Sequence, residues 1–148
     1  MTKLQDKIEH TLGEARMIIP GVQALIGFEF IAVINEGFSK LPKVLQYIHL
    51  GSLFLTILSA AILMSPAAFH RISEKGEDTA FFHRLASVLI MIGTIPLSIG
   101  ICLDFFIVSF KITQSIILSI FLSIFIFMIL CVLWFFLEVF VGKKEESK

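Results

Sequence analysis

The chain has 148 residues, of which 57% are hydrophobic and only 16% are charged, and its mean hydropathy is +0.93. A water-soluble domain of this length cannot bury so much apolar surface, so the composition indicates a protein that is solvated by a lipid bilayer. Twelve basic and twelve acidic residues give a net charge of zero, which excludes the basic surface expected of a nucleic-acid-binding protein.

Residues 1–16 precede the first apolar run and carry apolar side chains between charged ones. The apolar residues recur every three or four positions, at Leu4, Ile8, Leu12 and Ala15. This spacing is typical of an amphipathic helix, which we expect to lie in the cytosol. Pro20 and Gly21 then interrupt the pattern, so the helix either kinks into the first membrane span or ends and restarts there.

Four stretches of the chain are long and apolar enough to cross a bilayer core of about 30 Å as helices. They lie at residues 17–38, 44–64, 85–110 and 112–140. The expected fold class is therefore an all-α membrane protein with one transmembrane domain at 17–140 and a charged tail at 141–148. Only the short stretch around Lys111 offers a turn between the third and fourth spans.

The distribution of lysine and arginine predicts the orientation, because positively charged loops stay in the cytosol. Nine of these residues lie on the side of the chain ends, and three lie on the other side, at Lys40, Lys43 and Lys111. We therefore expect a multi-pass protein of a bacterial inner membrane with both termini in the cytosol. Five residues form the expected cytosolic interface with lipid phosphate or loop carboxylates: Arg16, His70, Arg71, His83 and Arg84.

Three acidic residues lie within or at the edge of the apolar spans, namely Glu29, Glu36 and Asp104. An ionisable group inside a bilayer is costly and indicates a functional site by default. Glu29 and Glu36 are two turns apart on a continuous helix, so we expect both carboxylates on one face, Glu36 at the outer mouth and Glu29 near the middle. The same face carries four apolar residues, Val22, Ile26, Ala32 and Val33.

One interpretation of this face is the pore of a homo-oligomeric cation channel. A ring of Glu36 carboxylates would bind inorganic cations, Glu29 would add a second acidic layer, and the apolar residues would form a constriction. Asp104 would brace the pore helix by accepting hydrogen bonds. In the structural alternative, Glu36 is an interfacial residue, and Glu29 is protonated and hydrogen-bonded to Gln23 or to a neighbouring helix.

Other functions are also consistent with the sequence. Glu29 could serve as the proton carrier of a small transporter, or the chain could be a non-transporting adaptor that binds lipid or a protein through its N-terminal helix and its second cytosolic loop. A bis-histidine haem is less well supported, because only His70 and His83 lie at comparable depth. No nucleophile elbow, phosphate loop or metal-spaced cluster indicates an enzyme, and we expect no cofactor.

Two family resemblances add to this interpretation. The segments GEARMIIPGVQALIGF, SPAAFHRI and FFHR resemble a family of small bacterial four-helix membrane proteins of unknown function. The segment ALIGFEFIAVINE, residues 24–36, is similar to the pore helix of the Orai calcium-release-activated calcium channels, in which a run of small and apolar residues ends in the selectivity-filter glutamate. Glu36 falls on that position.

The order of further landmarks extends the Orai resemblance along the chain. They are the pair His49 and Leu50 in the second span, Pro66 near its inner end, and Asp104 in the third span. The resemblance implies a calcium-permeable oligomeric channel in which Glu36 is the cation ligand. Two features depart from the family: Glu29 stands where Orai channels are apolar, and Arg16 is the one candidate for their basic inner pore.

Overall fold

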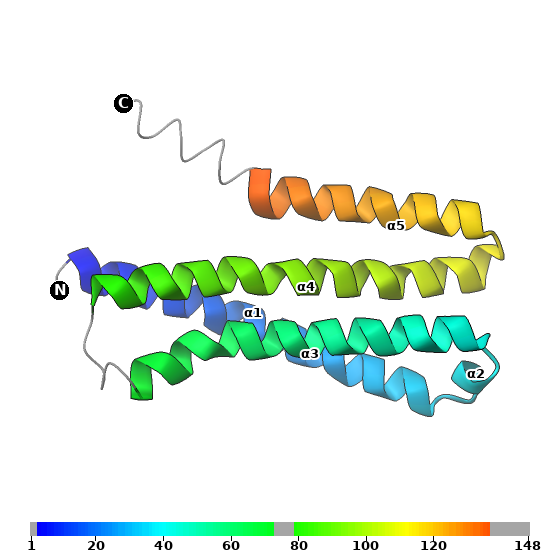
Figure 1. Ribbon diagram of the computed structural model, residues 1–148, viewed down its shortest axis with the longest axis horizontal. Coiled ribbons are helices and arrows are strands. Elements are labelled where there is room, and N and C mark those ends of the chain that lie inside the picture. The colour runs from blue at the N-terminus through cyan, green and yellow to red at the C-terminus, as the bar shows by residue number, and fades with distance from the viewer. Residues whose placement is uncertain (1–2, 73–78, 137–148) are drawn as a thin grey trace.

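The computed structural model describes residues 3–72 and 79–136, with side chains described for 6–72 and 79–134. Its elements in chain order are α1 (Lys3–Ile34), α2 (Glu36–Ser39), α3 (Lys43–Ile72), α4 (Ala80–Thr113), α5 (Ile116–Cys131) and the π-helical turn η1 (Val132–Phe136) (Figure 1). Helices α1, α3, α4 and α5 are each long and apolar enough to cross a membrane. The expected all-α fold with four helices long and apolar enough to span a membrane is therefore confirmed.

Helix α1 continues without a break through Pro20 and Gly21, so the amphipathic segment and the first span form a single helix. The helix then ends at Ile34, before the expected boundary at residue 38. Asn35 has an extended backbone with ψ of 135°, and its side chain accepts a hydrogen bond of 2.9 Å from the backbone N–H of Gly37. This cap starts α2 in a new direction.

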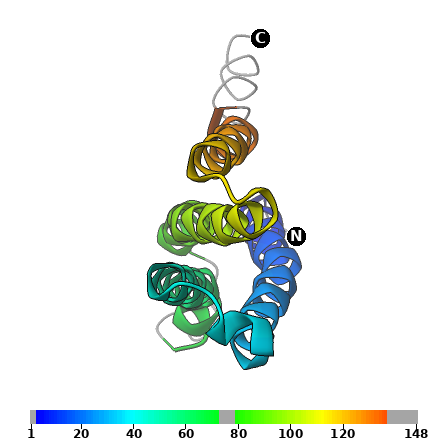
Figure 2. The ribbon, with the colours of Figure 1, turned by 90° about the vertical axis from the view of Figure 1, so that its right-hand side faces the viewer.

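Helices α1, α3 and α4 surround a common interior, and α5 lies on the outer side of α4 (Figures 1 and 2). One cluster of core residues joins Val22, Leu63 and Leu97. A second cluster, toward the N-terminus of α1, contains Ile8, Phe82 and Ala86. Among the described residues of α5 only Ser119 is buried, so this helix presents its apolar side chains outward, as expected for contact with lipid.

Helices α3 and α4 approach each other along a seam of small residues. A Cβ atom added at Gly93 or Gly100 would lie within 3.0 Å of a side-chain atom of α3, so a larger residue at either position would force that side chain to move. Hydroxyl groups of α3 donate to the facing backbone, from Ser59 to the Gly93 carbonyl at 2.7 Å and from Ser52 to the Gly100 carbonyl at 2.8 Å. Small residues of this kind allow close helix packing where no hydrophobic effect operates.

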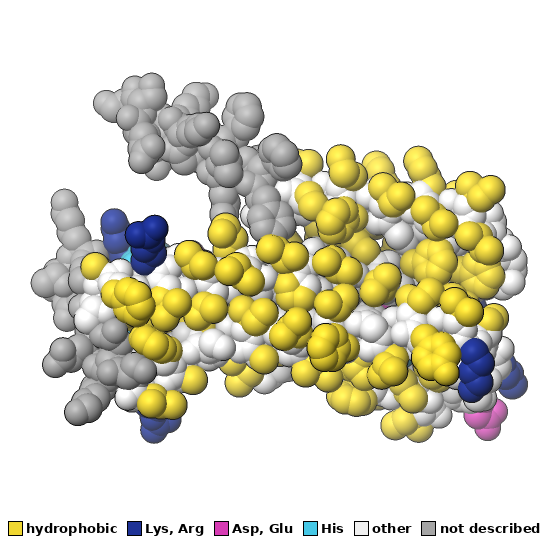
Figure 3. Space-filling model, in the orientation of Figure 1, with side chains coloured by type: hydrophobic (Ala, Val, Ile, Leu, Met, Phe, Trp, Pro, Cys, Tyr) yellow, Lys and Arg dark blue, Asp and Glu magenta, His cyan; other side chains and the backbone are white. Residues whose placement is uncertain are grey.

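The face of the bundle seen in Figure 3 is largely apolar along its length, and charged side chains lie near its two ends. Helices α1 and α4 begin at the same end of the bundle, and α5 runs back toward that end from the opposite one (Figure 1). The loop residues 73–78 and the expected tail at 141–148 lie outside the described residues.

Candidate functional site

Glu29 of α1 is the central residue of the site, and only 3% of its surface is exposed. It lies about one and a half turns before the end of α1, in the half of the bundle that is nearer α2. Its Oε1 atom accepts hydrogen bonds from Ser52 Oγ and Thr56 Oγ1 of α3, both at 3.0 Å. Its Oε2 atom has no donor among the described residues, and the carboxyl group of Asp104 is a direct neighbour.

Both hydroxyl groups also have an alternative acceptor. Ser52 Oγ lies 2.8 Å from the Gly100 carbonyl oxygen, and Thr56 Oγ1 lies 3.0 Å from the Ser52 carbonyl oxygen. Because a hydroxyl group has one proton to donate, each chooses between the carboxyl group and a backbone carbonyl. The site therefore provides hydrogen bonds for an ionised Glu29, and it keeps the hydroxyl groups satisfied when Glu29 is protonated.

His49 of α3 connects the other two helices of the site. Its Nε2 atom lies 3.0 Å from the Glu29 carbonyl oxygen, and its Nδ1 atom lies 3.1 Å from Oδ1 of Asp104 on α4. A carbonyl oxygen only accepts, so Nε2 must carry a proton. Nδ1 and Asp104 then share one further proton, either as imidazolium and carboxylate or as neutral imidazole and carboxylic acid.

A cavity of about 420 Å³ lies beside these groups, between α1, α4 and the turn that contains α2. Glu29, His49 and Asp104 contribute polar groups to its wall, and Lys111 adds a basic one. The remaining wall is mainly apolar, formed by Leu25, Phe28, Ala32, Phe38, Leu41, Ile107 and Val108. The Asp104 side chain is 22% exposed and that of His49 is 8% exposed, so Asp104 is the more accessible member of the pair.

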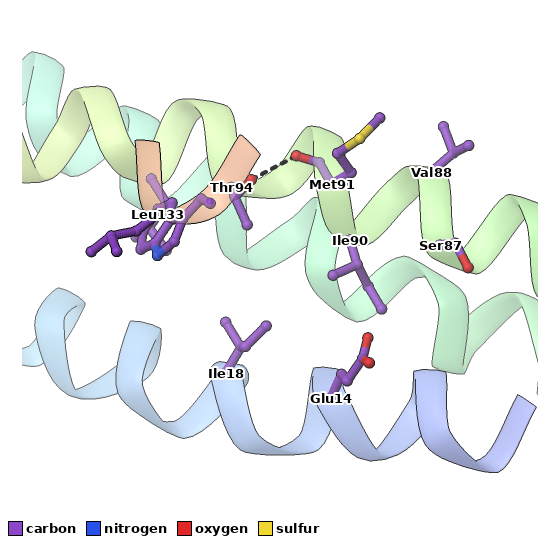
Figure 4. Close-up of a pocket in the computed structure, with 10 residues that line it drawn as sticks. Glu14, Ile18, Ser87, Val88, Ile90, Met91, Thr94 and Leu133 are labelled. Atoms are coloured by element: carbon purple, nitrogen blue, oxygen red, sulfur yellow. Dashed lines mark hydrogen bonds between the residues drawn. The ribbon is translucent and has the colours of Figure 1, made fainter. Parts of the chain in front are cut away.

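A second cavity, of about 540 Å³, lies between α1, α4 and η1 (Figure 4). Glu14 of α1 points into it toward α4, and Thr94 donates within its own helix to the Met91 carbonyl at 2.7 Å. Most of its wall is apolar. Glu14 is exposed, so this cavity holds no buried charge comparable to Glu29.

The expected alignment of Glu29 and Glu36 is wrong. Helix α1 ends at Ile34, and Glu36 is an exposed residue in the first turn of α2. The extended backbone of Asn35 breaks the helical register between the two carboxylates. They therefore do not share a helix face.

The face expected to line a pore lies only partly in the interior of its own chain. Val22 is buried in the core, and Ile26 packs at the edge of that core. Ala32 and Val33, which complete the expected face, are exposed. Gln23 is exposed and makes no hydrogen bond with Glu29, whose partners lie on the neighbouring helix instead.

The residues expected at the cytosolic interface lie at the end of the bundle opposite α2. Arg16, His70 and Arg71 line one groove between α1 and α3. His83 and Arg84 lie on the first turns of α4 and do not contribute to the lining of that groove.

Sequence reasoning identified Glu29 and Asp104 but missed the roles of His49, Ser52 and Thr56. These three residues are spaced three and four positions apart on α3, which places them on one helix face. A polar stripe in an otherwise apolar span was the signal that could have identified them.

Four apolar helices, with a polar site buried between three of them, define an α-helical membrane protein. The chain belongs to a family of unknown function, DUF6328, whose model matches residues 2–138. This match confirms the expected membership of a family without known function. No curated protein and no solved structure matches the chain, so the resemblance to Orai channels stays a hypothesis from the sequence.

Proposed function

We propose that this chain is a proton-coupled transporter of a small monovalent cation, with Glu29 as the proton carrier. The observation that carries the proposal is a carboxyl group only 3% exposed, beside a cavity of about 420 Å³ that His49 and Asp104 also line. A buried ionisable group of this kind in a membrane bundle is characteristic of proton relays and ion pathways.

The hydrogen bonds around Glu29 suit a carrier that alternates between two protonation states. When Glu29 is ionised, Ser52 and Thr56 donate to Oε1; when it is protonated, both hydroxyl groups can turn to backbone carbonyls. Neither state leaves the hydroxyl protons without an acceptor, so the change of state does not require the loss of these hydrogen bonds.

Asp104 and His49 supply a route for the proton between the cavity and Glu29. The pair holds one mobile proton, and Asp104 lies next to the Glu29 carboxyl group. A cation that enters the cavity would compete with protons for these carboxylates, which couples its movement to proton release. A single protomer contains all of these groups, so the cycle needs no partner copy.

This function agrees with the geometry better than a channel lined by α1. Such a channel requires Glu29 and Glu36 to face a common axis, whereas Glu36 is exposed on α2 and Glu29 is directed toward α3. Location in a bacterial inner membrane with cytosolic termini is part of the proposal, and it rests on the distribution of lysine and arginine.

Flux measurements in liposomes test the proposal. The purified protein is reconstituted with a trapped pH-sensitive dye, and sodium, potassium or a small quaternary ammonium ion is added outside. We expect cation-dependent proton flux that is abolished in Glu29→Gln and retained in the matched control Glu36→Gln. Flux that is retained in Glu29→Gln but abolished in Glu36→Gln would favour a channel. Absence of flux from the folded wild-type protein would favour a non-transporting adaptor.

A further inference from the structure

A groove of about 640 Å³ runs between α1 and α3 at the end of the bundle opposite α2. Its apolar walls include Leu12 and Ile19 of α1 and Ala67 of α3, and its basic residues are Arg16, His70 and Arg71. The α1 positions are three, four or seven residues apart, and His70 and Arg71 follow Ala67 by three and four residues, so each set lies on one side of its helix.

Arg16 and Arg71 bring two guanidinium groups to this one groove. Both are exposed, and neither forms an ion pair with a side chain of residues 6–72 or 79–134. Arg16 also borders a hollow on another side of α1 that is lined by Asp6, Glu9 and Glu14, but no salt bridge joins these residues to it. The groove therefore has an excess of positive charge among the described residues.

The position of the groove indicates a lipid rather than a soluble anion as its occupant. Arg16 precedes the first apolar span, and Arg71 lies at the end of α3. Their neighbours Met17 and Ile72 are 76% and 77% exposed, so apolar surface continues from the groove onto the outside of the bundle. A phospholipid has both parts that this surface requires, a phosphate group for the arginines and acyl chains for the apolar walls.

We propose that the groove binds an anionic phospholipid, with Arg16 and Arg71 as ligands of its phosphate group. Guanidinium groups match phosphate through paired N–H donors, which a diffuse surface charge does not do. Ile19 and Ala67, which lie on the membrane side of the two arginines, contact the first methylene groups of the acyl chains. This site is separate from Glu29, so it does not depend on the proposed transport function.

Native mass spectrometry tests the proposal on the full-length protein, released from phosphatidylcholine nanodiscs that contain increasing amounts of phosphatidylglycerol. We expect selective retention of phosphatidylglycerol by the wild-type protein. The double variant Arg16→Gln/Arg71→Gln should bind it about thirtyfold more weakly, which corresponds to about 1 kcal/mol for each arginine near a membrane surface. Arg84→Gln removes an arginine outside the groove and should bind like the wild type.

Three outcomes would overturn the proposal. Equal retention of phosphatidylcholine would remove the requirement for an anionic headgroup, and an equal loss in Arg84→Gln would indicate general surface charge. Displacement of the lipid by excess inorganic phosphate would identify a soluble-anion site instead. The variant Arg16→Lys/Arg71→Lys keeps the charge but not the paired donors, so we expect its affinity to be intermediate.

Discussion

The Nδ1 atom of His49 lies 3.1 Å from Oδ1 of Asp104, while Nε2 of the same ring donates to the Glu29 carbonyl oxygen at 3.0 Å. A single imidazole therefore joins α1, α3 and α4 beside the buried Glu29 carboxyl group. This arrangement makes the site both a structural connection and a place where protons are held, and the two roles can be separated by experiment.

Replacement of Glu29 by glutamine should stop proton coupling without unfolding the protein. The amide oxygen of glutamine can accept from Ser52 and Thr56, as Oε1 does now, and the amide N–H₂ can donate to Asp104. We expect the thermal midpoint in detergent to stay the same or to rise, because a costly buried acid is removed. Cation-dependent proton flux should be abolished, because glutamine cannot carry the proton.

Unchanged flux in Glu29→Gln would contradict a carrier role for this residue. Glu29→Asp provides a second comparison, because it keeps an ionisable group but shortens the side chain. We expect reduced flux that still depends on pH in this variant, and none in the glutamine variant.

His49 and Asp104 should be energetically coupled. His49→Ala removes the imidazole donor from the Glu29 carbonyl oxygen and the imidazole partner from Asp104, which costs about 1–3 kcal/mol in the free energy of unfolding. The double variant His49→Ala/Asp104→Asn should lose less free energy of unfolding than the sum of the losses in the two single variants. From unfolding titrations of the four proteins we expect a coupling free energy of about 0.6 kcal/mol and at most about 1.7 kcal/mol, which are the mean and the maximum known for hydrogen bonds in a membrane bundle. Additive losses would show that the contact contributes no pairwise stability.

Gly100→Ala should disturb both the helix seam and the site. The added Cβ atom would lie 2.9 Å from Thr56 Oγ1, one of the two hydroxyl donors to Glu29, so Thr56 must move. We expect the free energy of unfolding to fall by about 1–3 kcal/mol and the proton flux to be reduced. Gly51→Ala is the matched control, because its Cβ has no neighbour within 4 Å and alanine favours the helix. Equal stability of the two variants would contradict the close approach of α3 and α4.

Gln114 determines the turn between α4 and α5 through a left-handed backbone with φ of 54° and ψ of 19°. A β-branched residue is strained in this conformation and glycine is not, so Gln114→Val should lower the thermal midpoint and Gln114→Gly should not. We expect Gln114→Val to lower the free energy of unfolding by about 1–2 kcal/mol. Proton flux should survive both substitutions, since Glu29, His49 and Asp104 lie on α1, α3 and α4. A valine variant as stable as the wild type would argue against the left-handed turn.

The sequence predicted the spans well and the site only in part. Runs of apolar residues are a local property, and each of the four expected spans corresponds to a long apolar helix. Glu29 and Asp104 were identified because charge is conspicuous in an apolar span. Ser52 and Thr56 were not, since hydroxyl groups inside membrane helices commonly bond to their own backbone.

The sequence by itself determined that the chain folds as apolar helices, because residues in lipid must satisfy their backbone hydrogen bonds within the helix. Only the tertiary structure decided which way Glu29 faces. The extended backbone at Asn35 separated Glu36 from it, and the small residues of α3 and α4 brought His49, Thr56 and Asp104 into contact around it. Such contacts depend on the packing of distant segments, which a helical repeat along one span does not specify.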